Sequence, residues 1–327
     1  MTTPVTTDLV TLAAIREAAE RIRPIARVTP FVDVSRAAGR PLFLKCENLQ
    51  ATGAFKIRGA YNMVAQLTPD QRARGVVTYS SGNHGQAMAL AARELGAPAV
   101  VVMPTTAPSI KIEGTKAFGA EVIFAGTTSA DRRERAEAEA AARGLTMVPP
   151  FDHEWIIAGQ GTIGLEILEQ IPEVAAVLVP IGGGGMAAGT GAAIKQSAPG
   201  VKVVGVEPEG AAAMKASLEA GHPVTLPRTV SVADGLMPVR PGDLTYAHVS
   251  RFADAVVTVT DESIIEAVLW TFGNAKIVAE PSGAATIAAV RSGALDAAIH
   301  VDGPVVAIVS GGNMAAEKLV ELARSRT

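Results

Sequence analysis

A lysine at the start of a helix is the first residue of this sequence whose type and position could do chemistry. Lys56 follows a Thr-Gly turn signal in the segment ATGAFKIRGAYN. A helix is predicted after it, because apolar side chains recur at helical spacing at Ile57, Ala60, Tyr61 and Val64. Positive charge at a helix start opposes the helix dipole, so the charged form of the amine is disfavoured and its nucleophilicity rises. Arg58 has no such chemical role, and we expect it to form a structural ion pair.

Four consecutive glycines, Gly182 to Gly185, form a second candidate site in the segment LVPIGGGGMAAG. They stand between an apolar strand pattern and a helix pattern of small residues. Such a loop allows backbone N–H groups to converge on an anion, and the helix start adds a favourable dipole. No lysine follows the glycines, so the segment is not a P-loop for triphosphates. It predicts a site for one phosphate group, and the structural alternative is a tight turn with close helix packing.

A single phosphate site and a nucleophilic lysine together suggest pyridoxal phosphate, because the aldehyde of this cofactor forms a Schiff base with a lysine amine. The segment GQGTIG at residues 159–164 matches GxGxxG but indicates no dinucleotide site. No strand pattern precedes it, and position 184 holds glycine instead of the acidic residue that binds ribose. We expect a loop and a helix start there.

The elements that must position these residues alternate between short β-branched runs and amphipathic segments. Strands are predicted at residues 42–46, 75–80, 99–103, 121–125, 175–182, 201–207, 255–259 and 304–310. Helices are predicted at 84–96 and, with Ser129 as the N-cap, at 129–143. This alternation predicts an α/β fold with mostly parallel, twisted sheets flanked by helices. Ligands bind at the carboxyl ends of such strands, where this chain has SSGNHG, PIGGGGMAAG, VEPEG and SGGNM.

Composition excludes several classes of function. Of the 327 residues, 48% are hydrophobic and 19% are charged, which is enough apolar surface for sizeable cores in two lobes or one large unit. A net charge of −3 without a basic cluster indicates no nucleic-acid partner. Cys46 is the only cysteine, which excludes an internal disulfide and fits a reducing compartment. No segment predicts a membrane span or a secretion signal, and we expect a cytoplasmic protein.

Eight segments carry a resemblance to a known family. They are ENLQATGAFKIRGAYN, SSGNHGQAMALAA, IAGQGTIGLEI, PIGGGGMAAG, GVEPEG, VADG, EPSGAA and SGGNM, in that order along most of the chain. In these segments the chain resembles the threonine dehydratase and serine racemase family of fold-type-II pyridoxal phosphate enzymes, which are tryptophan synthase β-like. The resemblance implies two lobes, each with a mostly parallel sheet. Residues 1–70 and 150–327 would form a large cofactor-binding domain, and residues 71–149 a small domain that closes over the substrate.

The resemblance also implies roles for individual residues. Lys56 would carry the Schiff base and act as the base on the substrate Cα. Backbone N–H groups would hold the cofactor phosphate at Gly182, Gly183, Gly184, Gly185 and Met186. The cofactor ring would contact Asn83 at its hydroxyl oxygen, Ser310 at its pyridine nitrogen, and Phe55 and Gly235 beside it. The substrate carboxylate would bind at Ser80, Ser81, Gly82, Asn83 and His84, although His84 also fits as an ordinary residue at a helix start. Ala54 departs from the serine that is usual in the family.

The implied reaction is β-elimination of the hydroxyl group of L-threonine or L-serine, which gives a 2-oxo acid and ammonia. Ser81 matches a second base of serine racemases, so racemisation stays open as a side activity or as the primary one. Ser81 also fits as a simple hydrogen-bond donor to the substrate carboxylate. Phe151 resembles the dehydratases. Another β-hydroxy amino acid, such as threo-3-hydroxyaspartate or phenylserine, is a further alternative, and a homodimer is expected.

Three points stay open at the sequence level. Glu207 and the carbonyl of Ala211 match positions that bind Mg²⁺ or another cation in the family, but the third match is Ala213, and a hard cation needs several oxygens. Arg132 matches a substrate-lid arginine of racemases, yet its segment DRRERAEAEAAA favours a solvent-exposed helix face. A nucleotide-dependent oxidoreductase and a phosphate sensor without catalysis are the alternatives from other classes of function.

Overall fold

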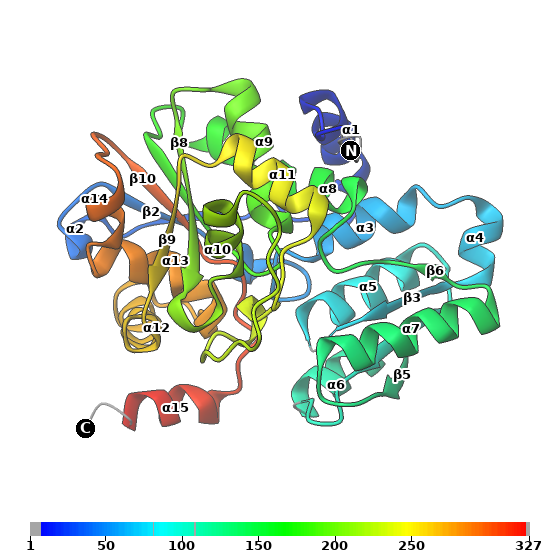
Figure 1. Cartoon of the computed structure of the whole chain (residues 1–327). Helices are drawn as coiled ribbons and strands as arrows, with labels where there is room; N and C mark the ends of the chain where they lie inside the picture. Colours follow the sequence, from blue (N-terminus) through cyan, green and yellow to red (C-terminus); the bar gives the residue numbers. More distant parts are fainter. Residues whose placement is uncertain (1–7, 81, 108, 325–327) are drawn as a thin grey trace.

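Two sheets organise the chain in the computed structural model, which describes residues 8–80, 82–107 and 109–324 (Figure 1). The larger sheet has the order β1-β2-β10-β7-β8-β9, with strands at Phe31–Asp33, Leu42–Lys45, Val305–Ile308, Ala176–Pro180, Lys202–Pro208 and Ala255–Val259. Only β1 is antiparallel to its neighbour. The smaller sheet is all parallel, in the order β5-β4-β3-β6, with strands at Glu121–Phe124, Ala99–Met103, Val76–Tyr79 and Thr146–Met147. The α/β fold and the mostly parallel sheets are as predicted.

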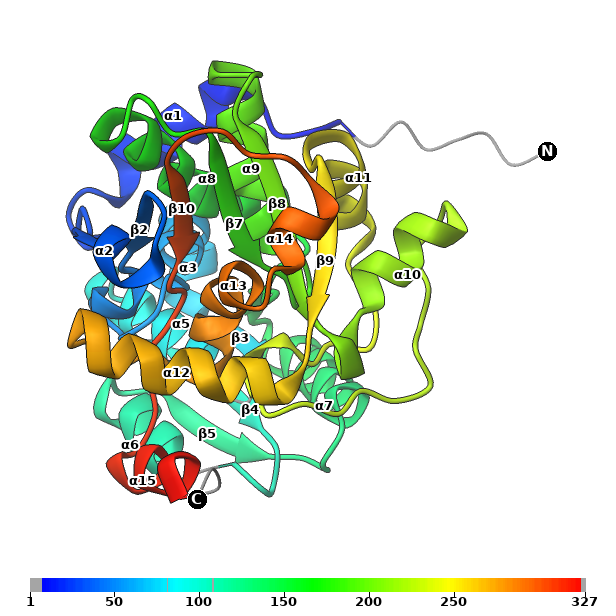
Figure 2. The ribbon, with the colours of Figure 1, turned by 90° about the vertical axis from the view of Figure 1, so that its left-hand side faces the viewer.

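Helices cover both faces of the larger sheet because its strands are apolar on both sides. On β10, Val305 and Ala307 belong to a core shared with α12 (Asp261–Ala275) and α13 (Pro281–Arg291). The alternate residues Val306 and Ile308 belong to a core shared with α8, α9 and α11, at Glu154–Gln170, Gly185–Ser197 and Asp243–Phe252. Figure 2 shows α12 and α13 on one side of these strands and α8 and α9 on the other.

The smaller sheet is also enclosed by helices. Val77, Val100 and Val102 pack with Ala136 of α7 (Ser129–Arg143) on one face. The other face packs against α3 (Ile57–Ala65) and α5 (Asn83–Glu94). The remaining α-helices are α1 Leu12–Ile22, α2 Ser35–Ala38, α4 Pro69–Arg74, α6 Ser109–Ala117, α10 Ala213–Ala220, α14 Ala294–Ala298 and α15 Ala316–Arg324, with 3₁₀ turns η1 Glu47–Leu49, η2 Glu209–Ala211 and η3 Asp234–Leu236. Among the residues described, no helix is long and apolar enough to cross a membrane.

Each of the eight predicted strands is present, with ends that differ from the prediction by at most two residues. The prediction missed β1 and β6, which have only three and two residues and therefore leave little periodic signal. The span of α7 is as predicted, but its N-cap is Thr128 rather than Ser129. The Thr128 hydroxyl accepts a hydrogen bond from Asp131 N, and the Asp131 side chain completes a capping box.

The predicted loop at GQGTIG was wrong, because residues 159–164 lie inside α8. These glycines allow close helix packing. A methyl group on Gly159 would lie 2.6 Å from the Cα atom of Gly59 in α3, and one on Gly161 would lie 3.0 Å from the carbonyl oxygen of Gly189 in α9. Backbone N–H groups inside a helix are already bonded, so this segment offers no phosphate site.

Candidate active site

Lys56 is the N-cap of α3, as the sequence predicts. Its amine donates a hydrogen bond to the carbonyl oxygen of Pro150 at 2.8 Å and lies 5.0 Å from the centre of the Phe55 ring. Burial lowers the pKa of Lys56 to about 8. The neutral amine, which can act as a nucleophile or accept a proton, is therefore far more populated near neutral pH than for an ordinary lysine.

The backbone before Lys56 lies against the end of β10. Phe55 N donates to Ser310 O at 3.0 Å, and Ala54 forms an antiparallel bridge with Gly311. The Ser310 hydroxyl is buried and donates a long, 3.4 Å hydrogen bond to Ser282 O. Ser282 in turn accepts a hydrogen bond from Gly235 N at its hydroxyl, at 2.9 Å. Phe55, Ser310 and Gly235 therefore share one neighbourhood.

The glycine loop joins β7 to α9. Gly184 is the N-cap of α9 with φ +96°, a conformation that favours glycine. Thr245 Oγ1 donates to Gly183 O at 2.7 Å and holds the loop. Within the described part of the chain, the N–H groups of Gly183, Gly184, Gly185 and Met186 donate to no protein acceptor. Converging N–H donors at a helix start are what an anionic group needs.

Contacts from Pro150 and Phe151 bring the loop and the lysine together. Pro150 accepts the Lys56 hydrogen bond, and a methyl group on Gly183 would lie 2.2 Å from the ring of Phe151. On the other side, a methyl group on Gly182 would lie 2.9 Å from Gly235 O. A closed ring of neighbours therefore runs from Lys56 through the glycine loop, Gly235 and Ser310 back to Phe55.

The predicted carboxylate-binding segment begins after β3. Ser80 Oγ accepts hydrogen bonds from Gly82 N at 3.1 Å and from Gly85 N at 3.0 Å. The imidazole of His84 is buried, and burial together with the nearby charge of Lys56 lowers its pKa to about 3. His84 is thus a neutral residue of the first turn of α5. Ser81 lies outside the described residues.

Asn83 connects this segment to the larger sheet. Its Nδ2 donates to Glu280 Oε1 at 2.6 Å, and its Oδ1 accepts from Asn313 Nδ2 at 2.9 Å. A methyl group on Gly311, next to Ser310, would lie 3.2 Å from Asn83 Nδ2. The two partners fix the orientation of the amide and leave the second N–H of Nδ2 able to donate to another group.

Several charged and polar residues around this site were not among the predicted site residues. Glu280 is buried, and burial followed by the charge of Asp234 raises its pKa to about 7. Lys111 forms an ion pair with Asp234. Glu280, Asp234 and Asn313 stand in the segments EPSGAA, VADG and SGGNM, which could have drawn attention to them. Lys111 gave no such signal, because its partner Asp234 is distant in sequence.

Glu207 does not look like a cation ligand in this structure. Its carboxylate accepts hydrogen bonds from Met214 N and Lys215 N, both at 2.8 Å, at the start of α10. Burial raises its pKa to about 7. Ala211 is a buried residue of η2. The residues that the structure describes contain no group of three or more His, Cys, Asp or Glu side chains that could hold a metal ion, so the expected cation finds no support.

Arg132 corrects another expectation, because it is 8% exposed rather than part of a solvated face. It shares the buried face of α7 with Ala136, four residues further on, and its Nη2 donates to Ser129 Oγ at 2.8 Å.

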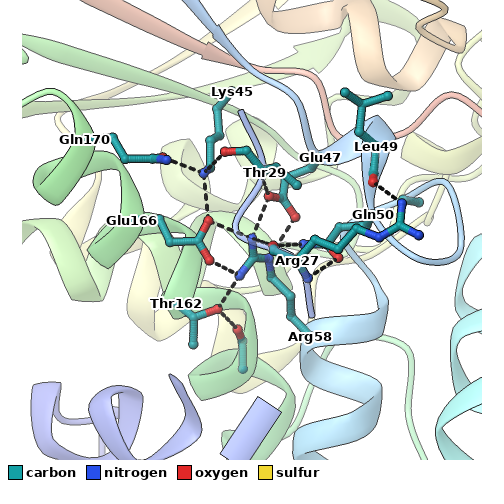
Figure 3. A network of polar contacts seen from close by, with 12 residues as sticks. Arg27, Thr29, Lys45, Glu47, Leu49, Gln50, Arg58, Thr162, Glu166 and Gln170 are labelled. Carbon is teal, nitrogen blue, oxygen red and sulfur yellow. Dashed lines mark hydrogen bonds and ion pairs between the residues drawn. The ribbon is translucent and has the colours of Figure 1, made fainter. Parts of the chain in front are cut away.

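The expectation that Arg58 forms a structural ion pair is confirmed (Figure 3). Its guanidinium donates to both oxygens of Glu47, at 2.7 and 2.8 Å, and to both oxygens of Glu166, at 2.6 and 2.9 Å. Lys45 completes the network with a 2.7 Å bond to Glu166. Burial would raise the pKa of Glu47, but the charge and hydrogen bonds of Arg58 lower it on balance. This network anchors the first turn of α3, which carries Lys56.

The residues of this site fit pyridoxal phosphate. The amine of Lys56 suits its aldehyde, and the unpaired N–H groups at the start of α9 suit its phosphate. Asn83 retains one free N–H that could donate to the cofactor. The Ser310 hydroxyl belongs to the same group of neighbouring residues as Lys56 and the glycine loop.

Comparison with known proteins agrees with this site. The family profile described as pyridoxal-phosphate dependent enzyme matches residues 22–311. An L-threonine ammonia-lyase of Thermotoga maritima is 44% identical over 310 residues, which are 94% of this chain and 76% of that protein. The biosynthetic L-threonine dehydratase of Escherichia coli is 40% identical over 86% of this chain, which spans 57% of that protein. The structure of maize serine racemase matches with a TM-score of 0.92 at 37% identity and covers 98% of both chains. The chain therefore belongs to the pyridoxal-phosphate-dependent enzymes, in the group that includes threonine ammonia-lyases and serine racemases.

Proposed function

We propose that the chain is an ammonia-lyase that converts L-threonine or L-serine to a 2-oxo acid and ammonia. The observation that carries this proposal is the partly buried amine of Lys56, with its lowered pKa, beside a glycine loop with free N–H donors. The likeness to the L-threonine ammonia-lyase of Thermotoga maritima over 94% of the chain supports the substrate class.

When bound, pyridoxal phosphate supplies an aldehyde that joins amines and a conjugated ring that stabilises negative charge at the substrate Cα. The glycine loop would hold the phosphate through Gly182, Gly183, Gly184, Gly185 and Met186. Lys56 would capture the aldehyde and later accept the proton of the substrate Cα, for which a pKa of about 8 is well suited near neutral pH.

Other side chains would orient the ring and set the outcome of the reaction. Asn83 would donate to the ring hydroxyl oxygen, and Phe55 and Gly235 would lie beside the ring. The hydroxyl of Ser310 would bond the pyridine nitrogen without protonating it. Because the Ser310 hydroxyl is not an acid, this site would favour prompt loss of the β-hydroxyl group over prolonged storage of negative charge. Ser80, Ser81, Gly82, Asn83 and His84 would receive the substrate carboxylate at the start of α5.

Serine racemisation is the second candidate. The likeness to maize serine racemase over 98% of both chains favours it. Ser81 would act as the second base in that case. Phe151, whose ring lies against Gly183, matches the residue that the dehydratases have at this position, and this resemblance favours elimination.

We also propose that residues 71–149 form a small domain that closes over the substrate, with residues 1–70 and 150–327 as the large domain. All strands of the smaller sheet lie within residues 76–147, which supports this division. We further propose a cytoplasmic homodimer. Leu49 and Val278 both have exposed apolar side chains. The two residues are close together, because Asn48, next to Leu49, donates a hydrogen bond to Val278 O. This exposed apolar pair supports a contact surface for a second copy.

A panel of β-hydroxy amino acids tests the proposed reaction. Both enantiomers of serine, threonine, 3-hydroxyaspartate and phenylserine are assayed for 2-oxo acid and for inversion at Cα. We expect 2-oxo acid from L-threonine or L-serine, and no turnover by Lys56→Ala, whereas Lys116→Ala on the exposed face of α6 should retain full activity. Inversion much faster than elimination would instead make the chain a racemase. Full elimination activity of Lys56→Ala would refute the role of the lysine.

A further inference from the structure

A buried lysine outside the proposed chemistry joins the two sheets next to the site. Lys111 lies in α6, which packs on α5 beside the smaller sheet, and it is 7% exposed. Its amine donates to Asp234, which lies in η3 between strands β8 and β9 of the larger sheet. The carboxylate of Asp234 is half exposed. The ion pair therefore connects a buried cation on one side of the site to a solvated anion on the other.

The side chain of Lys111 also covers the start of α5. A methyl group on Gly82, the N-cap of α5, would lie 2.7 Å from Lys111 Cδ and 3.0 Å from its Nζ. One turn further along α6, a methyl group on Gly114 would lie 3.1 Å from the side chain of Gln86 in α5. The stem of Lys111 is therefore packed directly against the backbone of Gly82.

Two carboxylates of the larger lobe face this amine. Burial would lower the pKa of Lys111, but Asp234 and then Glu280 raise it on balance. Glu280 also accepts the hydrogen bond of Asn83, the first residue of α5. Gly82 and Asn83 are thus fixed from one side by Lys111 and from the other by Glu280.

We propose that Lys111 is a positioning residue whose ion pair with Asp234 holds the start of α5, at Gly82 and Asn83, in the position that binds the substrate carboxylate. This inference rests on the proposed function. In this role Lys111 acts through α5, by its contact with Gly82. Loss of the ion pair allows α6 to move away from η3. The N–H groups at the start of α5 are then no longer held in the orientation that binds the substrate carboxylate.

Binding of glycine to the holoenzyme tests this role without turnover, because glycine has no β-hydroxyl group to eliminate. The change in the visible absorbance of the cofactor reports the dissociation constant. We expect Lys111→Met to weaken glycine binding about tenfold, a typical size for a positional coupling. Methionine keeps the apolar stem, and Asp234 stays solvated when unpaired, so the variant should fold. Asp234→Asn should have a similar effect, and the double variant should be no worse than either single one.

Matched controls separate positioning from stability. Lys116→Met, an exposed lysine of the same helix, should leave glycine binding unchanged. Thermal unfolding of the apoenzyme supplies a readout apart from the cofactor. A lower midpoint for Lys111→Met with glycine binding changed by less than about twofold would overturn the positioning role, as would additive losses in the double variant. If the wild-type protein forms no visible band with the cofactor, the proposed function itself fails, and this inference fails with it.

Discussion

Replacing the buried Arg58 should lower the free energy of unfolding far more than replacing an exposed arginine. Arg58 and Glu47 are fully buried, and four hydrogen bonds of 2.6–2.9 Å join the guanidinium to Glu47 and Glu166. Breaking a buried pair by removing one partner costs about 3–5 kcal/mol, because the other charge is left uncompensated. We therefore expect Arg58→Met to lose about 3–5 kcal/mol, a large share of the roughly 5–15 kcal/mol of a typical native state.

The stability that Arg58→Met loses should be larger at high pH than at low pH. In the wild type, Arg58 lowers the pKa of Glu47 on balance, so the stability that Glu47 contributes is present above its unfolded pKa and fades as the pH falls. Without Arg58, burial dominates and raises the pKa of Glu47 above its unfolded value. The variant then loses stability as the pH rises through that window. The difference between wild type and variant should therefore be larger at pH 8 than at about pH 5.

Urea denaturation of the apoenzyme at these two pH values is the assay. Arg143→Met serves as the control, because its ion pair with Glu121 at 2.9 Å is 41% and 52% exposed. An exposed pair of this kind contributes about 0–1 kcal/mol. A loss below about 1 kcal/mol for Arg58→Met, or an equal loss at both pH values, would refute the reasoning about a buried, compensated charge network.

Three further outcomes are expected. Gly183→Ala should weaken cofactor binding in fluorescence titrations, because the new methyl group would lie 2.2 Å from the Phe151 ring; unchanged binding would show that this loop is not the phosphate site. The rate at which the apoenzyme captures pyridoxal phosphate should rise with pH to a half-maximum near 8, since the neutral fraction of Lys56 rises through its pKa of about 8; a half-maximum near 10 would mean an ordinary lysine. Treatment with EDTA should leave the thermal midpoint unchanged, because Glu207 is occupied as the cap of α10; a drop reversed by Mg²⁺ would contradict this.

Local patterns were enough to predict the eight longer strands and the start of α3. Buried parallel strands read as continuous β-branched runs, and the amphipathic period after Lys56 places Ile57, Ala60 and Val64 in the core. The same patterns failed at GQGTIG, where glycines in a helix interior serve packing against Gly59 and Gly189. A glycine needed for close approach looks the same in a sequence as a glycine needed for a turn.

The features that could not be predicted from the sequence depend on contacts between residues that are far apart along the chain. Arg132 looked solvated because its neighbours are charged, yet α7 turns it toward the smaller sheet together with Ala136. The pairs of Lys111 with Asp234 and of Asn83 with Glu280 join residues more than 100 positions apart. No local pattern reveals such pairs, and without them neither the electrostatics of the site nor the fixed start of α5 can be predicted.

Borohydride reduction of the holoenzyme followed by peptide mapping tests the central claim most directly. Reduction fixes pyridoxal phosphate to the amine that carries it. The account predicts one modified peptide, with the cofactor on Lys56, and no modification at Lys45 or Lys111, whose amines are held by Glu166 and Asp234. A cofactor fixed to another lysine, or none fixed at all, would contradict it.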